Sequence, residues 1–327
     1  MTTELGRRQF LAALAAATVR PTLSAAEKPM RGIFPIVATP FTQSNQVDYE
    51  DLAREVDFLE RCGAHGIVWP QNASNYRNLT REERMKGMEV LAQAARKRKP
   101  ALVLGVQAGT TEQMLEYARK AESLEPDALI AIPPLGGKSL EDSRAYYRAL
   151  GSLTKRPVFI QTSSGGPGTE PSVELMLELA REFPHLGYVK EEVNPVQERM
   201  KTLVNHKPPM KAVMSGADSV GLTYELRFGA DGSMPKACFA DIQVAVWDLW
   251  HAGRREKARE AFSTLLLMLN IARLIPGVPE YIMKRRGAFK TALTRRKGGE
   301  LYEAKLTPEQ ITEVEYNFAS MKPYLKA

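Results

Sequence analysis

Short apolar runs alternate with amphipathic stretches along most of the chain. Each run has the length of a strand, and the stretch after it carries apolar residues at helical spacing. In the stretch 48–62, for example, Leu52, Val56 and Leu59 share one helical face. Eight runs predict strands, the last of them short and rich in small residues: 32–38, 66–69, 101–106, 127–132, 157–161, 186–189, 211–214 and 232–234.

This order of elements indicates an α/β fold. Strands that are apolar throughout belong to a sheet covered on both faces. Eight strands, each followed by a helix, are the pattern of a (β/α)8 TIM barrel. From residue 241 onward the chain predicts only helices, at 241–252, 255–274, 279–294 and 307–322. We therefore expect a barrel over 27–240, then its last helix and a C-terminal helical extension over 241–327.

Residues 1–26 carry the features of an export signal. Arg7 and Arg8 form a twin-arginine pattern, the apolar run 11–19 follows, and residues 24–26 (SAA) supply the small side chains that a signal peptidase needs. This run is too short to span a bilayer, and no later run reaches that length. We expect a twin-arginine signal peptide over 1–26, cleavage after Ala26, and a periplasmic protein without a membrane span. A disordered basic leader is the alternative.

The chain is mildly basic, with 45 lysines and arginines against 38 aspartates and glutamates. The positive charge is spread over many predicted helices, and its few clusters lack interleaved aromatic residues, so nucleic-acid binding is not expected. A small anionic substrate is an equally good use for this charge. Cys62 and Cys238 are too few for a disulfide framework, and neither they nor the four histidines show the spacing of a metal site. We expect no metal.

One predicted strand ends on a residue suited to chemistry. The run 186–189 is followed directly by Lys190, Glu191 and Glu192. Active sites of (β/α)8 barrels lie on the face made by the carboxyl ends of the strands. In partly apolar surroundings a lysine loses charge stabilisation, and its neutral amine can attack a carbonyl. The stretch therefore predicts a Schiff base between Lys190 and a keto acid. A strand-end lysine that reaches solvent or pairs with Glu191 is the alternative.

Five segments, taken in order, carry a resemblance to a known family. They are 36–41 (IVATPF), 188–191 (YVKE), 214–218 (MSGAD), 229–233 (GADGS) and 284–306. These resemble the first strand, the lysine-bearing strand, the seventh and eighth strands and the tail of the dihydrodipicolinate synthase and N-acetylneuraminate lyase family. The members of this family are class I, Schiff-base-forming aldolases. The chain resembles a divergent, exported member over nearly all of its mature length.

The resemblance implies roles for individual residues. Lys190 matches the imine-forming lysine, and Thr39 matches a relay or positioning hydroxyl. Asn72 and the amide of Ala73 would cradle a substrate carboxylate. No metal or organic cofactor is implied, and a homo-oligomer built from dimers, a dimer or a tetramer, is expected. The remaining residues expected to bind substrate are Gln161, Gly216 and Met234.

Three loops depart from the family pattern. The loop 71–75 (QNASN) lacks the hydroxyl pair that holds the substrate carboxylate, and 163–166 (SSGG) lacks an arginine that some members use for a second carboxylate. The segment 133–136 (PPLG) lacks the tyrosine that relays protons, although a positioned acid or base typically contributes roughly 10²- to 10⁴-fold to the rate.

No replacement for that tyrosine is evident. Glu191 should face away from Lys190 in an extended strand, and a structural ion pair is its expected role. Tyr76 or Arg77 could reach in from the loop after the second strand. Two further tyrosines, Tyr146 and Tyr147, lie poorly placed on a predicted helix.

Two functions therefore stay open. The first is a Schiff-base-forming lyase, an aldolase or a dehydratase, that acts through Lys190 on a 2-keto acid or keto-sugar acid. The second is a catalytically degenerate barrel that binds a small anionic metabolite. Retention of the lysine favours the enzyme, and the rewritten loops favour the binding protein. Because a fold does not fix a function, only the site can separate the two.

Overall fold

The computed structural model describes residues 28–327, so the signal peptide expected over 1–26 lies outside the described residues. Eight parallel strands form one sheet in the order β1-β8-β7-β6-β5-β4-β3-β2. A bridge between Ile36 and Val68 joins its two edges and closes the barrel. The (β/α)8 prediction is confirmed. The strands are β1 (Gly32–Ile33), β2 (Gly66–Trp69), β3 (Ala101–Gly105), β4 (Ala128–Ala131), β5 (Val158–Gln161), β6 (Tyr188–Glu191), β7 (Ala212–Ser215) and β8 (Gly232–Ser233).

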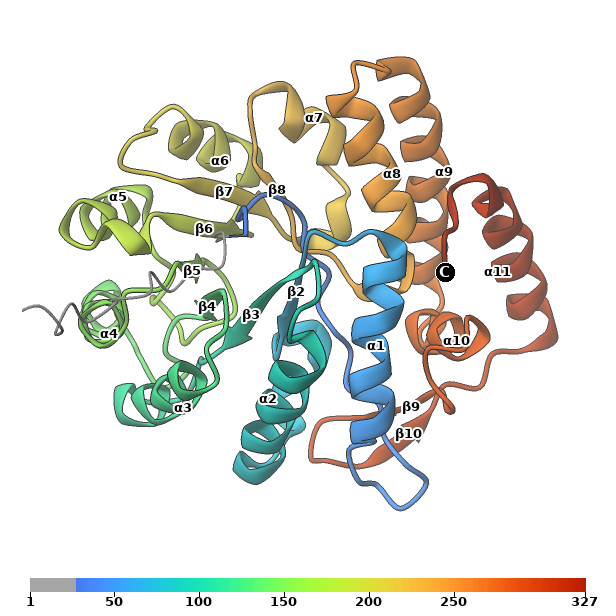
Figure 1. Cartoon of the computed structure of the whole chain (residues 1–327), viewed down its shortest axis with the longest axis horizontal. Helices are drawn as coiled ribbons and strands as arrows, with labels where there is room; N and C mark the ends of the chain where they lie inside the picture. The colour runs from blue at the N-terminus through green and yellow to red at the C-terminus, as the bar shows by residue number, and fades with distance from the viewer. Residues whose placement is uncertain (1–27) are drawn as a thin grey trace, which may run out of the picture.

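One helix follows each strand, and together these helices ring the barrel (Figure 1). The side chains of Asp48, Thr80, Thr110, Ser139 and Ser172 each accept a hydrogen bond from a backbone N–H in the first turn of a helix. These caps fix where several loops from strand to helix end. The helices are α1 (Tyr49–Cys62), α2 (Arg81–Ala95), α3 (Thr111–Ser123), α4 (Leu140–Leu153), α5 (Val173–Glu182), α6 (Val196–Val204), α7 (Leu222–Arg227) and α8 (Ala240–His251).

The strands separate two apolar layers. The inner layer fills the barrel and the outer layer packs the strands against the helices. Along β5, Phe159 belongs to the inner layer and Ile160 to the outer layer, as the alternation of side chains along a strand requires. Buried members of the inner layer are Phe34, Ile36, Val68, Ala101, Val103, Ala128, Ile130, Phe159, Met214 and Met234.

Beyond α8 lie three more helices and a two-stranded hairpin, on one side of the barrel (Figure 1). The expected C-terminal helical extension is present, but the helix predicted over 279–294 is wrong. The helix ends at Arg285, since Gly287 adopts a left-handed φ of 71°. The residues after it lead into the hairpin. The elements are α9 (Arg255–Leu274), α10 (Val278–Arg285), β9 (Leu293–Arg295), β10 (Leu301–Glu303) and α11 (Pro308–Ser320).

A buried ion pair ties this extension to the barrel. Arg286 follows α10 and is almost fully buried, and its two terminal nitrogens lie 2.5 and 3.2 Å from the carboxylate of Asp241 on α8. The same carboxylate accepts a hydrogen bond from the backbone N–H of Lys326. Removal of one partner from such a pair leaves an uncompensated buried charge.

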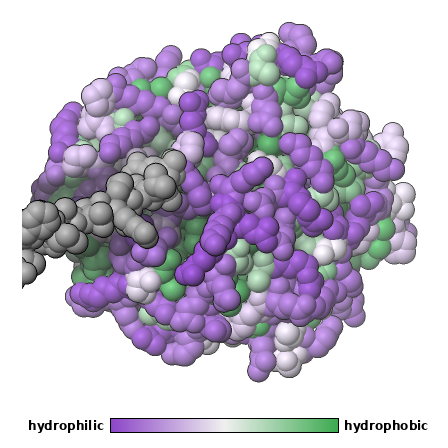
Figure 2. All heavy atoms as spheres, viewed as in Figure 1, coloured by the Kyte–Doolittle hydropathy of each residue, from purple (hydrophilic) through white to green (hydrophobic). Residues whose placement is uncertain are grey.

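The leucine-rich part of α9 is only partly core. Leu265 and Met268 are buried, whereas Leu266 and Leu267 are exposed on the outer surface. Between residues 28 and 327 no single helix is long and apolar enough to cross a membrane; α9 and α10 meet that test only as a pair bent by 119°. The face drawn in Figure 2 is largely hydrophilic, with hydrophobic side chains scattered between the charged ones.

A second buried carboxylate supports the first loop of the barrel. Glu55 on α1 is fully buried, and one of its oxygens accepts a hydrogen bond of 3.0 Å from the N–H of Ala38, while the other has no hydrogen-bond partner among residues 28–327. Burial raises the pKa of the Glu55 carboxyl well above its usual range, against the lowering effect of the Ala38 N–H. The folded state therefore holds a proton here at pH values where the unfolded chain has released it.

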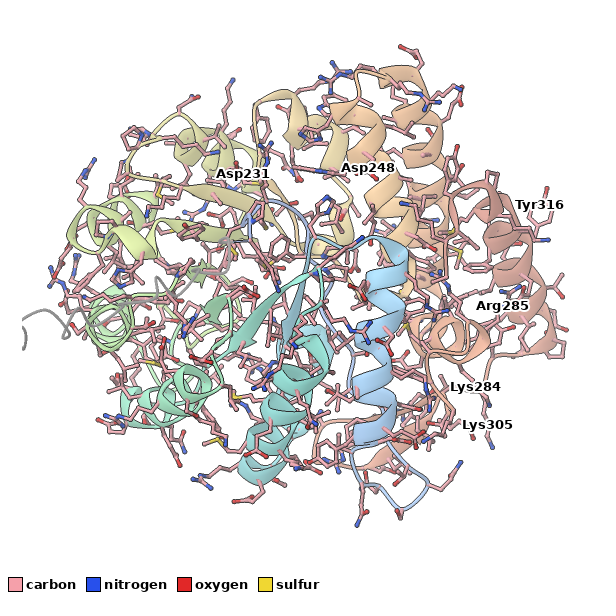
Figure 3. The ribbon with its side chains drawn as sticks, viewed as in Figure 1. Asp231, Asp248, Lys284, Arg285, Lys305 and Tyr316 are labelled. Atoms are coloured by element: carbon pink, nitrogen blue, oxygen red, sulfur yellow. The ribbon has the colours of Figure 1, made fainter. Side chains whose placement is uncertain are left out.

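We expect Asp241→Ala to lower the free energy of unfolding by about 3–5 kcal/mol, because Arg286 is left buried without a counter-charge. Urea unfolding followed by circular dichroism measures the change. The control is Asp248→Ala on the same helix (Figure 3), where Asp248 lies 3.8 Å from Lys326 and is half-exposed. That variant should lose at most about 1 kcal/mol. Equal losses in the two variants would contradict the role given to the buried pair.

We expect the free energy of unfolding of Glu55→Gln to rise relative to that of the unmodified protein as pH increases from 5 to 8. Since the folded state binds more protons than the unfolded state above the usual carboxyl pKa, the stability contributed by Glu55 is lost as pH rises through its raised pKa. Glutamine keeps an acceptor for Ala38 and cannot titrate. Urea unfolding at several pH values gives the difference directly, and a difference independent of pH would contradict the shift.

Glu60→Gln on the same helix provides a control of opposite sign. The N–H of Lys99 lowers the pKa of Glu60, so its contribution is present above the usual carboxyl pKa and is lost as pH falls through the lowered value. The unmodified protein should therefore be more stable to unfolding than Glu60→Gln at neutral pH, and this difference should disappear in acid.

Candidate active site

Lys190 and Gln161 project into the barrel at the carboxyl ends of neighbouring strands. Gln161 on β5 pairs in register with Lys190 on β6, which pairs with Met214 on β7. Met214 belongs to the inner apolar layer, and residues paired in register point to the same face of a sheet. The Lys190 side chain is only 2% exposed. The amine thus lies inside the barrel, near the mouth where the strands end.

Three side chains form a closed set of contacts, which we call the amine cluster: Lys190, Gln161 and Glu192. The Lys190 Nζ lies 3.2 Å from Glu192 Oε1 and donates to Gln161 Oε1 at 3.4 Å. Gln161 Nε2 donates to Glu192 Oε2 at 2.7 Å. Gln161 therefore accepts from the amine with one atom and donates to the carboxylate with the other. Each of the three side chains thus contacts the other two.

Two neighbours hold Glu192 in this position. Ser163 Oγ donates to the carboxylate at Oε2 over 2.9 Å, and Thr162 Oγ1 accepts from the backbone N–H of Glu192 at 2.9 Å. On the other side lies Gly216, where an added Cβ would come within 1.9 Å of Glu192 Oε1. Gly216 was expected to bind substrate; the structure places it directly against the carboxylate of the amine cluster.

Glu191 faces the opposite way, as expected. Its Oε1 accepts hydrogen bonds from Thr162 Oγ1 at 2.6 Å and the Val193 N–H at 2.8 Å, and its Oε2 lies 3.1 Å from Arg199 Nε on α6. Burial raises the pKa of Glu191, while these partners oppose the shift. Glu191 thus belongs to the packing between the barrel and α6. The carboxylate that pairs with Lys190 is Glu192, not Glu191.

Thr39 and Ala73 lie on the β1–β2 side of the mouth. Thr39 Oγ1 donates to the Ser74 carbonyl at 2.5 Å and accepts from Trp69 Nε1 at 3.0 Å. Both residues line a cavity that is also lined by Lys236 and Glu280. No hydrogen bond within the described chain joins Thr39 to the amine cluster. The structure therefore places the expected hydroxyl relay in a separate set of contacts.

Asn72 and Arg77 reach across the mouth to the loop after β5. Asn72 Nδ2 donates to Ser164 Oγ at 2.9 Å, and Arg77 Nη2 donates to the Ser164 carbonyl at 2.6 Å. β2 and β5 are not neighbours in the sheet, so these bonds bridge two separate parts of the rim. Ser163, next in the chain to Ser164, touches Glu192, and the bridge is therefore continuous with the amine cluster.

The loop after β7 has a strained backbone. Ala217, Asp218 and Ser219 adopt positive φ angles of 48°, 55° and 69° in succession. Such conformations cost non-glycine residues free energy and collect at functional sites. Ser219 Oγ donates to Ser233 Oγ at 2.9 Å, and Asp218 Oδ1 accepts from the Lys236 N–H at 3.0 Å. These bonds hold the turn against β8 and so fix Gly216 at the mouth.

Met234 and the candidate tyrosines lie in other surroundings. Met234 is buried in the apolar interior of the barrel. Tyr146 OH accepts from the Ala108 N–H, and Tyr147 OH donates to the Ala131 carbonyl. Tyr76 is buried, its ring beside the guanidinium of Arg84, and burial raises its pKa. None of these hydroxyls contacts Lys190 in the described chain.

Sequence reasoning missed Glu192 as a member of the site. The signal was nevertheless present: side chains two positions apart in an extended segment share one face, so Lys190 and Glu192 should lie together and Glu191 apart. In residues 28–327 no group of three or more histidine, cysteine or acidic side chains is arranged to hold a metal. Cys62 and Cys238 are buried free thiols.

Comparison with known proteins agrees with this architecture. The chain is 23% identical over 279 residues to an L-2-keto-3-deoxyarabonate dehydratase from Azospirillum brasilense, an alignment covering 83% of this chain and 90% of that protein. It is 26% identical over 266 residues to a 4-hydroxy-tetrahydrodipicolinate synthase from Rhizobium meliloti, covering 79% of this chain and 88% of the relative.

Among solved structures, a 4-hydroxy-tetrahydrodipicolinate synthase from Methylacidiphilum fumariolicum superposes with a TM-score of 0.79 at 20% identity, over 91% of this chain and 97% of the other. An N-acetylneuraminate lyase from Mycoplasma synoviae superposes with a TM-score of 0.75 at 22% identity, over 89% of this chain and 97% of the other. These likenesses show the fold. The model of the dihydrodipicolinate synthetase family matches residues 29–306, and the chain belongs to that family.

Proposed function

We propose that this protein is a Schiff-base-forming lyase that acts on a 2-keto acid or keto-sugar acid through Lys190. The observation that carries the proposal is the amine cluster: a buried lysine at the carboxyl end of β6 whose amine is 3.2 Å from a carboxylate. Family membership supports it, since relatives carry the names of a dehydratase, a synthase and a lyase.

In the proposed reaction the neutral Lys190 amine attacks the C2 carbonyl of the substrate. Loss of water gives an iminium ion, which withdraws electrons from the neighbouring carbon–carbon and carbon–hydrogen bonds. The lysine thus supplies the electrophile, and the proposal includes no metal or organic cofactor. Removal of a C3 proton, followed by loss of a C4 hydroxyl, would make the protein a dehydratase; cleavage between C3 and C4 would make it an aldolase.

The substrate carboxylate should lie on the side of the mouth away from Glu192, because two carboxylates repel each other. Asn72 and Arg77 offer an amide and a guanidinium from the loop after β2, next to the Ala73 backbone; in the structure both are bonded to Ser164. Thr39 would act there as a positioning hydroxyl. The contacts of Gln161 with both Lys190 and Glu192 support a role for it in the proposed site.

One observation favours the binding barrel as a second candidate. The Lys190 side chain is 2% exposed, and its amine pairs with a carboxylate. In addition, the bonds of Asn72 and Arg77 to Ser164 bridge the mouth. A protein that binds a small anion without chemistry could keep such a closed arrangement. Covalent trapping separates the two candidates, because only the enzyme forms an iminium ion.

We expect borohydride to trap pyruvate, or another member of a panel of 2-keto acids, on Lys190. Intact mass should show one ligand-dependent adduct per chain, and peptide mapping should place it on Lys190. Lys190→Ala should abolish the adduct. The matched control is Lys211→Ala, since Lys211 immediately precedes β7 at the opposite end of the barrel. Folded protein that binds no keto acid covalently would support the binding barrel instead.

We propose further that the chain is exported with removal of residues 1–26, and that it forms a homo-oligomer. Exposed Leu266 and Leu267 on α9 offer an apolar surface for contact between copies. Export fits a catabolic role on sugar acids better than a cytoplasmic biosynthetic one. We expect amino-terminal sequencing of the periplasmic protein to begin at Glu27, and light scattering to give a multiple of the chain mass; a cytoplasmic full-length monomer would contradict both.

A further inference from the structure

The proposed reaction needs a group that moves protons, and the usual tyrosine is absent. The segment after β4 reads Pro133-Pro134-Leu135-Gly136. The hydroxyls of Tyr146 and Tyr147, on α4, are bonded to backbone groups at Ala108 and Ala131. Among residues 28–327, Glu192 is the one carboxylate that pairs with the Lys190 amine.

The two oxygens of Glu192 have different surroundings. Oε2 accepts hydrogen bonds from Gln161 Nε2 and Ser163 Oγ, which fix it. Oε1 faces the Lys190 amine at 3.2 Å. The side chain is 19% exposed, whereas the neighbouring Glu191 is fully buried. One oxygen is therefore anchored and the other is placed where a group attached to the lysine nitrogen would lie.

Gly216 leaves the space that Glu192 occupies. The space exists because position 216 has no side chain: a Cβ there would lie 1.9 Å from Glu192 Oε1 and 2.5 Å from the carboxyl carbon. The absence of a side chain at position 216 thus permits the contact between Glu192 and Lys190.

We propose that Glu192 is the catalytic acid and base of this site, the residue that carries protons between the Lys190 nitrogen, the departing oxygen and C3 of a 2-keto acid. The inference rests on the proposed function, because it needs an imine at Lys190. Repulsion between carboxylates turns the substrate carboxylate away from Glu192, so that C3 of the imine faces Glu192 Oε1 beside the Lys190 nitrogen.

The proton balance closes without any other reactant. Glu192 takes one proton from the Lys190 ammonium, and the amine electron pair forms the N–C2 bond while the carbonyl π electrons move to oxygen. A second proton passes from nitrogen to that oxygen, giving the carbinolamine. Glu192 then returns its proton to the hydroxyl, which leaves as water, and an iminium ion remains. Removal of a C3 proton by Glu192 moves the C–H electrons into a C2–C3 double bond and gives the enamine.

Solvent exchange at C3 measures the last step separately from imine formation. The mature protein is incubated with pyruvate in deuterium oxide, and proton nuclear magnetic resonance follows loss of the methyl signal. Borohydride trapping after prolonged incubation reports the equilibrium yield of imine. Glu192→Gln keeps the size of the side chain and its bond from Ser163. We expect this variant to retain the trapped adduct on Lys190 and to exchange C3 protons roughly 10²- to 10⁴-fold more slowly.

Two further variants keep the test independent of folding. Glu191→Gln neutralises the adjacent carboxylate, and it should exchange protons at the unmodified rate, because Glu191 faces α6. Glutamine keeps an acceptor oxygen there for Thr162 Oγ1 and the Val193 N–H. Gly216→Ala leaves Glu192 in the sequence but displaces its carboxylate, and it should slow C3 exchange at least tenfold.

The outcomes separate the two proposals. Failure of the unmodified protein to trap any keto acid would remove the proposed function, and this inference with it. An adduct in Glu192→Gln with C3 exchange at the unmodified rate would overturn the inference and leave the proposed function standing. Loss of the equilibrium adduct in folded Glu192→Gln would also overturn it, since Glu192 would then position the amine rather than move protons.

Discussion

The contact between the Lys190 amine and the Glu192 carboxylate inside the barrel mouth is the interaction on which the site depends. Removal of two charges from water is costly unless each finds a partner and further hydrogen bonds. Gln161 and Ser163 supply those bonds, and Gly216 supplies the room. These residues lie at or just beyond the ends of β5, β6 and β7, and parallel pairing of these three neighbouring strands brings them together.

The alternation of side chains along β6 assigns its two carboxylates to different roles. Glu191 points outward, where Arg199 and Thr162 hold it between the barrel and α6. Glu192, one position later, returns to the inner face beside Lys190. Adjacent residues of the same type thus serve packing and chemistry respectively. A shift of one residue in register would exchange them, and the outward pair with α6 opposes such a shift.

The barrel could be read from the sequence because its strands are uniformly apolar and its helices begin at capping residues such as Thr80 and Ser172. The end of α10 and the hairpin after it were missed, although Gly287, which follows a basic last turn, is a signal that ends helices. Lys190 was found from its place at the end of a strand together with the family resemblance of 188–191. The bridge from Asn72 and Arg77 to Ser164 depends on loop geometry that no sequence period encodes.

Two features of the mouth cost stability. A charged pair is buried at Lys190, and three successive left-handed residues follow Gly216. Natural sequences carry such conflicts where function requires them and remove them elsewhere. A barrel released from catalysis would gain stability by replacement of the buried pair with apolar side chains and by relief of the turn. Retention of both, together with a carboxylate aligned on the amine, favours an active lyase over a binding barrel.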